Sequence, residues 1–375
     1  MTGKQTNVVL TIPEPGVART VEKPYPTIMP GYALVEVAIA PVCNEAAIFR
    51  SHRFEWHDDP EHLGHEGVGT VVETAAGSQF EAGDRVLVFQ GNPCGECFVC
   101  LEGLSPTHCL AKPYEDFELG FIPKDLPNTM LGMERLNGSE SGGFAMARYR
   151  IASERMMIKL PDDLSFHHAA AGNCSVGANY TFAEETGVTA GDVVLVAGIG
   201  FMGLGAIITA AHRNATVVAL GRNEYRMELS RRCGADHVLN PEDPGWLSKL
   251  HEISAPKKGA DVAFECSGAP MYITAALAGL RRYGTLFQEG FSPGEEAGYT
   301  LNALNQLMDR HVSWMGGHDV RFRDRVGVLQ MLRDPEVQER IDAMVTHTFP
   351  MSRAQEAFEV GVSKQCGKIY LLPQE

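Results

Sequence analysis

The fold is decided by the stretch Val193–Ile208, which has the sequence VVLVAGIGFMGLGAII. A short β-branched apolar run leads into a glycine-rich turn, and an apolar run typical of a helix follows it. The glycines keep the spacing G-x-G-x-x-G, which allows a tight turn, a close approach to a pyrophosphate, and close packing of helix on strand. The helix N-terminus offers free N–H groups to the phosphates. The residues expected to contact a dinucleotide are Gly198, Gly200, Phe201, Met202 and Gly203.

Further apolar runs follow this turn, at 215–221, 233–239, 261–266 and 284–290, with helix-like stretches between them. Strands that alternate with helices form a parallel sheet with right-handed crossovers. We therefore predict an α/β fold built on a doubly wound Rossmann sheet.

The residue that ends the second of these strands indicates the cofactor. A sheet that binds NAD(H) carries Asp or Glu there, for the ribose 2′-hydroxyl. This chain has Gly221 instead, with Arg222 next and Arg226 one turn later. Without the carboxylate a 2′-phosphate is not repelled, and arginines can pair with it. The pattern favours NADP(H) over NAD(H), unless Arg222 is only a solvated loop charge.

The part of the chain before residue 160 is organised differently. Short apolar runs separated by Gly and Pro occur at 8–12, 33–39, 67–73 and 83–88. Such runs are typical of a β-rich domain, here a partly open barrel. We predict a catalytic β-rich domain over 1–160, a dinucleotide-binding domain over 161–315, and a return of 316–375 to the first domain.

Four cysteines form a compact motif, C-x2-C-x2-C-x8-C, in a lobe over 92–110. Thiolates this close in a reducing compartment can complete a tetrahedron around one zinc ion. Four protein ligands leave no open position, so the predicted zinc is structural. Its ligands are Cys94, Cys97, Cys100 and Cys109.

Cys43 follows a predicted strand, and His65 and Glu66 precede the next one. Cys, His and Glu are common zinc ligands, and strand ends hold side chains rigidly. On spacing alone, a metal site and ordinary core positions both remain possible here.

Composition limits the partners and the location. The chain has 375 residues, nine cysteines and a formal net charge of −15. This charge argues against a nucleic-acid backbone or an anionic membrane as a partner. No apolar run approaches the roughly 20 residues of a membrane span, and the N-terminus lacks a signal pattern. We expect a cytoplasmic protein with reduced thiols.

Together these motifs resemble the zinc-dependent medium-chain dehydrogenase/reductase family, the alcohol and polyol dehydrogenases, over essentially the whole chain. The motifs that carry the resemblance are Cys43, 64–67 (GHEG), 83–86 (GDRV), the four-Cys lobe, Cys174, 198–203 and 367–368 (GK). The resemblance implies a GroES-like catalytic domain, two zinc ions per chain, and a homodimer or homotetramer. It also implies a catalytic zinc on Cys43, His65 and Cys174, with Glu66 beside it or exchanging as a ligand.

The chain departs from the family pattern in its zinc motifs. The lobe has one extra residue before Cys109, which a loop can absorb. Counting back from 191–192 makes Cys174 the third catalytic ligand. Matching 175–177 to a similar tripeptide of polyol dehydrogenases would place Gly172 there, a residue that cannot ligate. We choose Cys174, because this count needs little or no gap.

A further departure lies two residues after Cys43. The family usually has Ser or Thr there, which passes on the substrate proton, whereas this chain has Glu45. Ala46 replaces the usual Asp, and Ile48 stands where some members have a relay His. One hypothesis is that Glu45 receives the alcohol proton or binds a polar substrate group. The alternative is that Glu45 turns away and supports the zinc ligands.

These observations predict a zinc-dependent oxidoreductase that transfers hydride between NADP(H) and a secondary alcohol, ketone or aldehyde. Glu45 and an acidic segment at 115–140 favour a polyol-, sugar- or cyclitol-like substrate, while Phe54 and Trp56 leave an aromatic aldehyde possible. The long 110–145 segment is a pocket wall, a solvated excursion or a subunit contact. Alternatives are a zinc-free reductase of activated C=C bonds and a non-catalytic NADPH- and zinc-binding protein.

Overall fold

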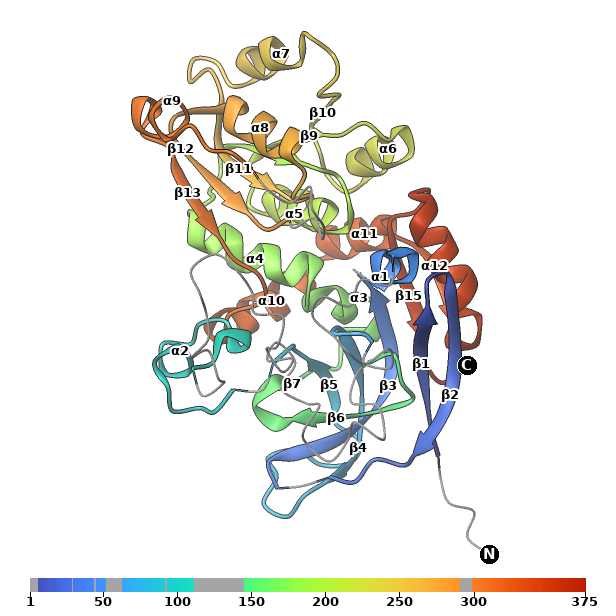
Figure 1. Cartoon of the computed structure of the whole chain (residues 1–375). Helices are drawn as coiled ribbons and strands as arrows, with labels where there is room; N and C mark the ends of the chain where they lie inside the picture. The colour runs from blue at the N-terminus through green and yellow to red at the C-terminus, as the bar shows by residue number, and fades with distance from the viewer. Residues whose placement is uncertain are drawn as a thin grey trace, which may run out of the picture.

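The parallel sheet predicted around the glycine turn occupies one half of the molecule, drawn in green to orange in the upper part of Figure 1. A computed structural model describes residues 6–28, 30–43, 45–51, 63–91, 93–110, 145–290 and 299–375. The sheet has the strand order β10-β9-β8-β11-β12-β13, and all its pairs are parallel. Its strands are β8 (Val193–Ala197), β9 (Thr216–Leu220), β10 (His237–Leu239), β11 (Ala260–Glu265), β12 (Leu280–Gln288) and β13 (Ser313–Gly316).

Helices cover both faces of this sheet, because successive strand side chains alternate between the faces. Val194 and Val196 of β8 pack into one core with α4 (Ser175–Thr186) and α5 (Phe201–His212). Leu195 packs into the other core with α7 (Trp246–Ile253) and α8 (Pro270–Gly279). The doubly wound Rossmann sheet predicted from the sequence is thus confirmed.

A second sheet lies in the lower half of Figure 1. Its strands run in the order β14-β15-β3-β4-β5-β7, and β6 also pairs with β3. These strands are β3 (Tyr32–Val42), β4 (Gly67–Thr74), β5 (Arg85–Val88), β6 (Tyr149–Ser153), β7 (Met157–Lys159), β14 (Val345–Pro350) and β15 (Lys368–Leu372). β1 (Thr6–Glu14) and β2 (Val17–Pro24) form a separate antiparallel pair. Within the described residues this sheet does not close on itself, which agrees with a partly open barrel.

The end of the chain joins the two halves. β15 pairs antiparallel with β3, so Ile369 lies opposite Val42, one residue before Cys43. The remaining helices are α1 (Glu45–Ser51), α2 (Phe98–Leu101), α3 (Phe166–Ala169), α6 (Glu224–Arg232), α9 (Ala303–Gln306), α10 (Arg325–Leu332), α11 (Pro335–Met344) and α12 (Ala354–Ser363). Among them α10 contacts α4, and α11 contacts α5 and α6. After the parallel sheet, the chain adds strands to the second sheet again only from β14 onward. The domain boundaries at 160 and 315 stay predictions.

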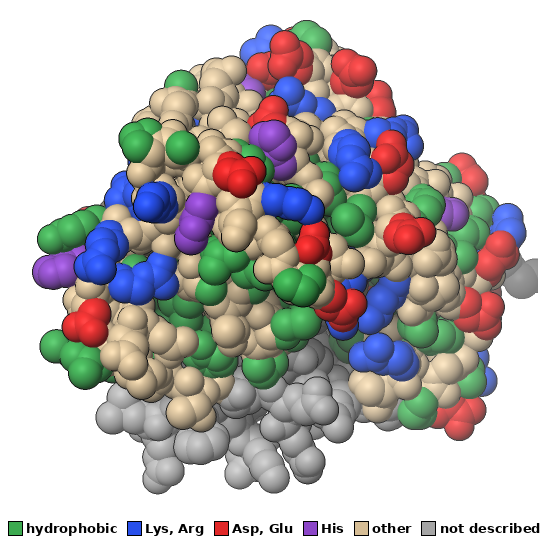
Figure 2. All heavy atoms as spheres, turned by 90° about the horizontal axis from the view of Figure 1, so that it is seen from above, with side chains coloured by type: hydrophobic (Ala, Val, Ile, Leu, Met, Phe, Trp, Pro, Cys, Tyr) green, Lys and Arg blue, Asp and Glu red, His purple; other side chains and the backbone are tan. Residues whose placement is uncertain are grey.

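The face of the molecule over the parallel sheet carries charges of both signs. Figure 2 shows Lys and Arg intermixed with Asp and Glu across this face. In the part of the chain that the structure describes, no helix is both long and apolar enough to cross a membrane. The predictions about Phe54, Trp56 and most of the 110–145 segment fall outside the described residues.

Candidate active site and zinc sites

Cys43, His65 and Cys174 meet where three separate elements end. Cys43 follows β3, His65 precedes β4, and Cys174 precedes α4. The Sγ atoms of Cys43 and Cys174 lie 3.8 Å apart, although 131 positions separate them in sequence. With a carboxylate oxygen of Glu66, one potential ligand atom from each residue lies within 4.8 Å of all the others. The structure therefore brings together the four residues predicted for a catalytic zinc.

A break between two helices presents Cys174 to this cluster. α3 and a 3-10 turn over 170–172 end before it, and α4 begins after it. A Cβ at Gly172 would lie 2.6 Å from Leu332 Cδ1 and 3.1 Å from Leu87 Cδ2, so a side chain here would have to displace buried leucines. Asn173 donates hydrogen bonds to the carbonyl oxygens of His65 (3.0 Å) and Val88 (2.9 Å), which ties the break to the second sheet. The geometry supports Cys174 over Gly172 as the third ligand.

The cluster has the dimensions of a zinc site. Tetrahedral Zn–S bonds of about 2.3 Å place two sulfurs about 3.8 Å apart. The two Sγ atoms match that spacing. A hydrogen bond from Cys174 lowers the pKa of the Cys43 thiol well below its usual value, helped by Lys368 and His65 and opposed by burial. This environment favours a thiolate, the form that ligates zinc.

Glu66 lies against a cation that the sequence prediction did not assign. Lys368 Nζ donates to Glu66 Oε1 at 2.6 Å, and both side chains are completely buried. The pair neutralises a carboxylate inside the protein, where an unpaired charge would be very costly. Glu66 Oε2 has no hydrogen-bond partner in the described structure, and His65 Nε2 is 3.6 Å from Oε1. Glu66 thus keeps one oxygen free beside the candidate zinc ligands.

Glu45 faces His65 with both of its oxygens engaged. Oε2 accepts the Cys43 N–H at 2.7 Å, and Oε1 accepts the Gly64 N–H at 3.2 Å. Oε1 also lies 3.3 Å from His65 Nδ1. Burial opposes ionisation of Glu45, but His65 and the Cys43 N–H outweigh it and lower the pKa of Glu45 to about 2. A carboxylate on Nδ1 leaves Nε2 as the nitrogen that can bind a metal.

The second cysteine cluster is local and lies beside α2. Its Sγ–Sγ distances are 3.5 Å for Cys97–Cys100, 3.8 Å for Cys97–Cys109 and 3.9 Å for Cys94–Cys100. These distances bracket the edge of a tetrahedral zinc–thiolate site. Hydrogen bonds from the backbone N–H groups of Cys100 and Leu110 lower the pKa of Cys97 to about 6, and burial opposes them. The donor set fits a structural zinc.

The glycine turn has the shape that the sequence predicts. Gly198 has φ +96°, a conformation that side chains disfavour. A Cβ at Gly203 would lie 2.0 Å from the Gly198 carbonyl oxygen, so only glycine permits this contact of helix and strand. A Cβ built at Gly200 would have only Arg226 Nη1 within 4 Å, at a distance of 3.9 Å. The turn therefore leaves an open approach beside a cation, which suits a pyrophosphate.

Gly221 has a packing role as well as the predicted cofactor role. A Cβ there would lie 2.2 Å from Ile199 Cδ1 and 2.3 Å from its Cγ1. An Asp or Glu side chain at this position would therefore collide with Ile199 of the glycine turn. Arg222 is half exposed and pairs with Glu242 at 2.9 Å. Arg226 donates to the Cys366 carbonyl at 3.1 Å and so lies closer to the turn.

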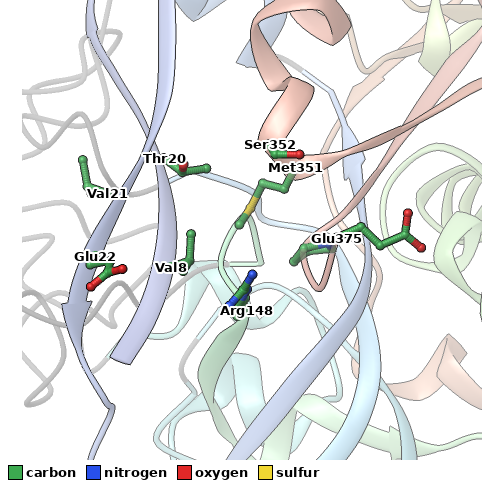
Figure 3. A pocket seen from close by; sticks show the side chains of 9 residues that line it. Val8, Thr20, Val21, Glu22, Arg148, Met351, Ser352 and Glu375 are labelled. Carbon is green, nitrogen blue, oxygen red and sulfur yellow. The ribbon is translucent and has the colours of Figure 1, made fainter. Parts of the chain in front are cut away.

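Other polar groups and pockets lie elsewhere. The groups His108–His318–Asp319 and His167–His168–Asp342 each contain a carboxylate that pairs with an imidazole of its own group. A pocket of about 370 Å³ lies between β1, β2 and the end of the chain (Figure 3). Its lining includes Val8 and Arg148 but no cysteine or histidine among the described residues, so it is not the candidate site.

Sequence reasoning named the motif 367–368 but gave Lys368 no role, and it missed Asn173. Lys368 opens the otherwise apolar strand KIYLL, and a charge in such a strand was the available signal. Asn173 gave no signal, because its two carbonyl partners come from distant parts of the chain.

Comparisons with known proteins agree with this geometry. Residues 29–162 match the model "Alcohol dehydrogenase GroES-like domain", and residues 202–331 match "Zinc-binding dehydrogenase". A sorbitol dehydrogenase of Halalkalibacterium halodurans is 26% identical over 359 residues, covering 94% of each chain. An alcohol dehydrogenase structure from Thermus sp. ATN1 has a TM-score of 0.81 at 22% identity, covering 97% of this chain and 99% of that one.

A further solved structure is bound to a cofactor. A zinc-binding dehydrogenase from Sinorhizobium meliloti 1021, bound to NADP, has a TM-score of 0.78 at 19% identity, with 98% of this chain and 100% of that chain covered. These likenesses confirm the resemblance proposed from the sequence. The chain therefore belongs to the zinc-dependent medium-chain dehydrogenase family, the oxidoreductases that include alcohol and polyol dehydrogenases and work with zinc and a nicotinamide cofactor.

Proposed function

We propose that this chain transfers hydride between NADP(H) and a polar secondary alcohol or the corresponding ketone, or an aldehyde. The observation that carries the proposal is the cluster of Cys43, His65 and Cys174. Its two sulfurs have zinc-site spacing, and the cluster touches the glycine turn, since Cys174 Sγ lies 3.5 Å from Met202 Sδ. Metal and dinucleotide would therefore share one cleft.

We propose that Cys43, His65 and Cys174 hold a zinc ion, with Glu66 as a neighbour or exchanging ligand. Zinc bound there would polarise the substrate oxygen and lower the pKa of an alcohol. The buried Lys368 holds Glu66 in place by an ion pair. A second zinc on the four-Cys cluster would brace the lobe, which makes two zinc ions per chain.

We infer that Glu45 is a positioning residue. Its oxygens are occupied by two backbone N–H groups and by His65 Nδ1. These contacts support the alternative in which Glu45 orients a zinc ligand over the one in which it takes the substrate proton. Such outer partners of a metal-bound histidine fix its tautomer and orientation.

Our proposal of NADP(H) rests on the surroundings of Gly221. No acidic side chain occupies this position, and Arg222 follows directly. Arg222 is available for a 2′-phosphate after exchanging its exposed partner Glu242. Arg226, beside Gly200, is better placed for the pyrophosphate.

We propose a small polyol-, sugar- or cyclitol-like substrate and a homodimer or homotetramer. The sorbitol dehydrogenase relative supports a polar substrate, and it covers nearly the whole chain.

Counting zinc per chain, on protein purified without chelator, tests the proposal first. Two zinc ions per chain, followed by turnover of polyols or ketones with NADP(H), would support it. One zinc ion that is lost from Cys97→Ser but kept in Cys43→Ser would exclude the catalytic zinc. The function would then be the zinc-free reduction of activated C=C bonds.

A further inference from the structure

Glu289 is a buried acid that the proposed mechanism does not use. It directly follows β12, and its neighbour Cys266 directly follows β11. Ligands of open α/β sheets bind outside these carboxyl ends of the strands. Cys266 Sγ lies 2.6 Å from Glu289 Oε1, whereas Glu289 Oε2 is buried and has no hydrogen-bond partner in the described structure.

Glu289 lies between the glycine turn and the metal cluster. The side chain of Asn179 lies close enough to the Glu289 carboxyl group to lower its pKa. The same Asn179 donates to the Met202 carbonyl at 3.2 Å, and Met202 contacts Cys174. On the other side, the turn approaches Ser267, since a Cβ at Gly198 would lie 2.9 Å from Ser267 Cβ. A nicotinamide ring that joins the pyrophosphate turn to the metal must pass this region.

The hydrogen bonds of Asn179 hold its side chain in one orientation beside Glu289. Both Nδ2 hydrogens of Asn179 are used, on the carbonyls of Ser175 (2.8 Å) and Met202 (3.2 Å). These two carbonyls fix the orientation of the amide, because a flip would place oxygen against oxygen. What remains is Oδ1, an acceptor that is buried and unpartnered in the described structure.

Glu289 Oε2 is itself buried and has no hydrogen-bond partner in the described structure. A carboxylate would leave this buried oxygen charged and without a donor, which is costly, whereas the protonated acid carries no charge. Burial raises the pKa of Glu289 to about 8, with Glu265 and Cys43 adding to the rise and with Cys266 and Asn179 opposing it. The missing partner of Oε2 and the burial of the carboxyl group therefore both favour a neutral acid at pH 7.

We propose that Glu289 senses the redox state of the nicotinamide: it is a neutral acid in the free enzyme and releases its proton to solvent when the oxidised ring binds. The oxidised ring carries a positive charge, which favours the carboxylate, and the reduced ring is neutral. Binding of NADP⁺ then expels one proton from Glu289, while binding of NADPH expels none. This inference rests on the proposed function for its ligand.

Calorimetry in buffers of different ionisation enthalpy tests the proposal by counting the protons released on binding NADP⁺ and NADPH. Both cofactors carry the same 2′-phosphate, so the difference between them cancels its titration. We expect the wild-type protein to release up to one more proton on binding NADP⁺ than on binding NADPH. Its affinity should rise by up to about tenfold per pH unit as the pH approaches 8, because ionised Glu289 then no longer has a proton to lose.

Glu289→Gln is the matched variant, because its amide has the size of the neutral acid but cannot ionise. We expect it to bind NADPH like the wild type and to lose the NADP⁺-specific proton release. Cys266→Ala, which removes a donor to Oε1, should shift the pH dependence of NADP⁺ affinity to higher pH. This second variant provides a test even where Glu289→Gln does not fold.

Unchanged proton release in a folded Glu289→Gln variant with wild-type zinc content would overturn the proposal and assign the proton to the metal cluster. An unshifted pH dependence in Cys266→Ala would also contradict it. If the wild type binds neither NADP⁺ nor NADPH, the proposed function itself is wrong, and this inference falls with it.

Discussion

The two cysteine clusters contain similar ligands but are assembled differently. Cys94, Cys97, Cys100 and Cys109 lie within one short segment, whereas Cys43, His65 and Cys174 come from three distant elements. Backbone N–H groups support the local cluster, and buried side chains of Glu45, Glu66 and Lys368 surround the distributed one. The local cluster can serve only the lobe that it closes. The distributed cluster has a free carboxylate oxygen and a neighbouring glycine turn, so it is where chemistry can take place.

The largest effect on kcat/KM is expected from removing a ligand of the distributed cluster, and this effect separates the roles of the two clusters. Cys174→Ser should lower kcat/KM at least about 1,000-fold, since a metal contributes several kcal/mol to the transition state. It should also remove one zinc ion per chain. Cys233→Ala is the matched control, because Cys233 is buried and belongs to neither cluster. Equal turnover in Cys174→Ser and the control would contradict the assignment of the active zinc.

A smaller effect is expected at Glu45. Glu45→Gln places an amide where two backbone N–H groups and His65 now meet a carboxylate. Zinc affinity, measured by competition with a chelator, and kcat/KM should each fall about 10- to 100-fold. Glu36→Gln on β3 is the control. If instead zinc affinity is kept and one limb of the pH–rate profile disappears, Glu45 is the proton acceptor; full turnover would exclude both roles.

The ratio of kcat/KM with NADPH to kcat/KM with NADH should change by about tenfold when Arg222 is removed. This is the effect of losing one charge-assisted hydrogen bond to the 2′-phosphate. Arg222→Ser should lower kcat/KM for NADPH relative to NADH, while Arg231→Ser in the last turn of α6 should not. Gly221→Asp alone should harm the use of both cofactors, because its Cβ meets Ile199. Combined with Ile199→Ala, it should shift the preference toward NADH. An unchanged ratio in the double variant would refute the NADP(H) preference.

The smallest effect on turnover is expected in the local cluster. Cys97→Ser should keep kcat/KM near the wild-type value at low temperature and lose one zinc ion. Its stability should fall by about 3 kcal/mol, by analogy with opening a cross-linked loop of about 15 residues. Thermal inactivation of the variant and of Cys233→Ala would measure this. A Cys97→Ser protein that keeps its stability but loses activity would contradict a purely structural zinc.

The sequence was most informative where the relevant residues are neighbours in the chain. The glycine turn around Gly198 and the Cys94–Cys109 spacing could be predicted because one local pattern contains the whole feature. The strand alternation likewise predicted the Rossmann sheet, whose β8 side chains supply both cores. By contrast, Cys43, His65 and Cys174 could be joined only through a family resemblance.

Features that depend on tertiary contacts could not be predicted. The pairing of Lys368 with Glu66 spans 302 positions, and no local pattern encodes it. Gly221 looked like a cofactor signal alone, but its contact with Ile199 depends on how the turn meets β9. The hypothesis that Glu45 accepts a proton stays a prediction, now set against two backbone donors that only the folded chain brings to it.

The position of Lys368 has a consequence for the order of assembly during synthesis. Ribosomes release Cys43, His65, Glu66 and Cys174 long before β15, since the chain emerges from its N-terminus. Until β15 emerges, β3 has an unpaired edge at residues 40–42, and Glu66 has no counter-ion. The nascent protein can collect its metal ligands early, but the charge balance around them is complete only when the last strand docks. Completion of the candidate site therefore waits for β15, even though its ligands Cys43, His65 and Cys174 are made much earlier.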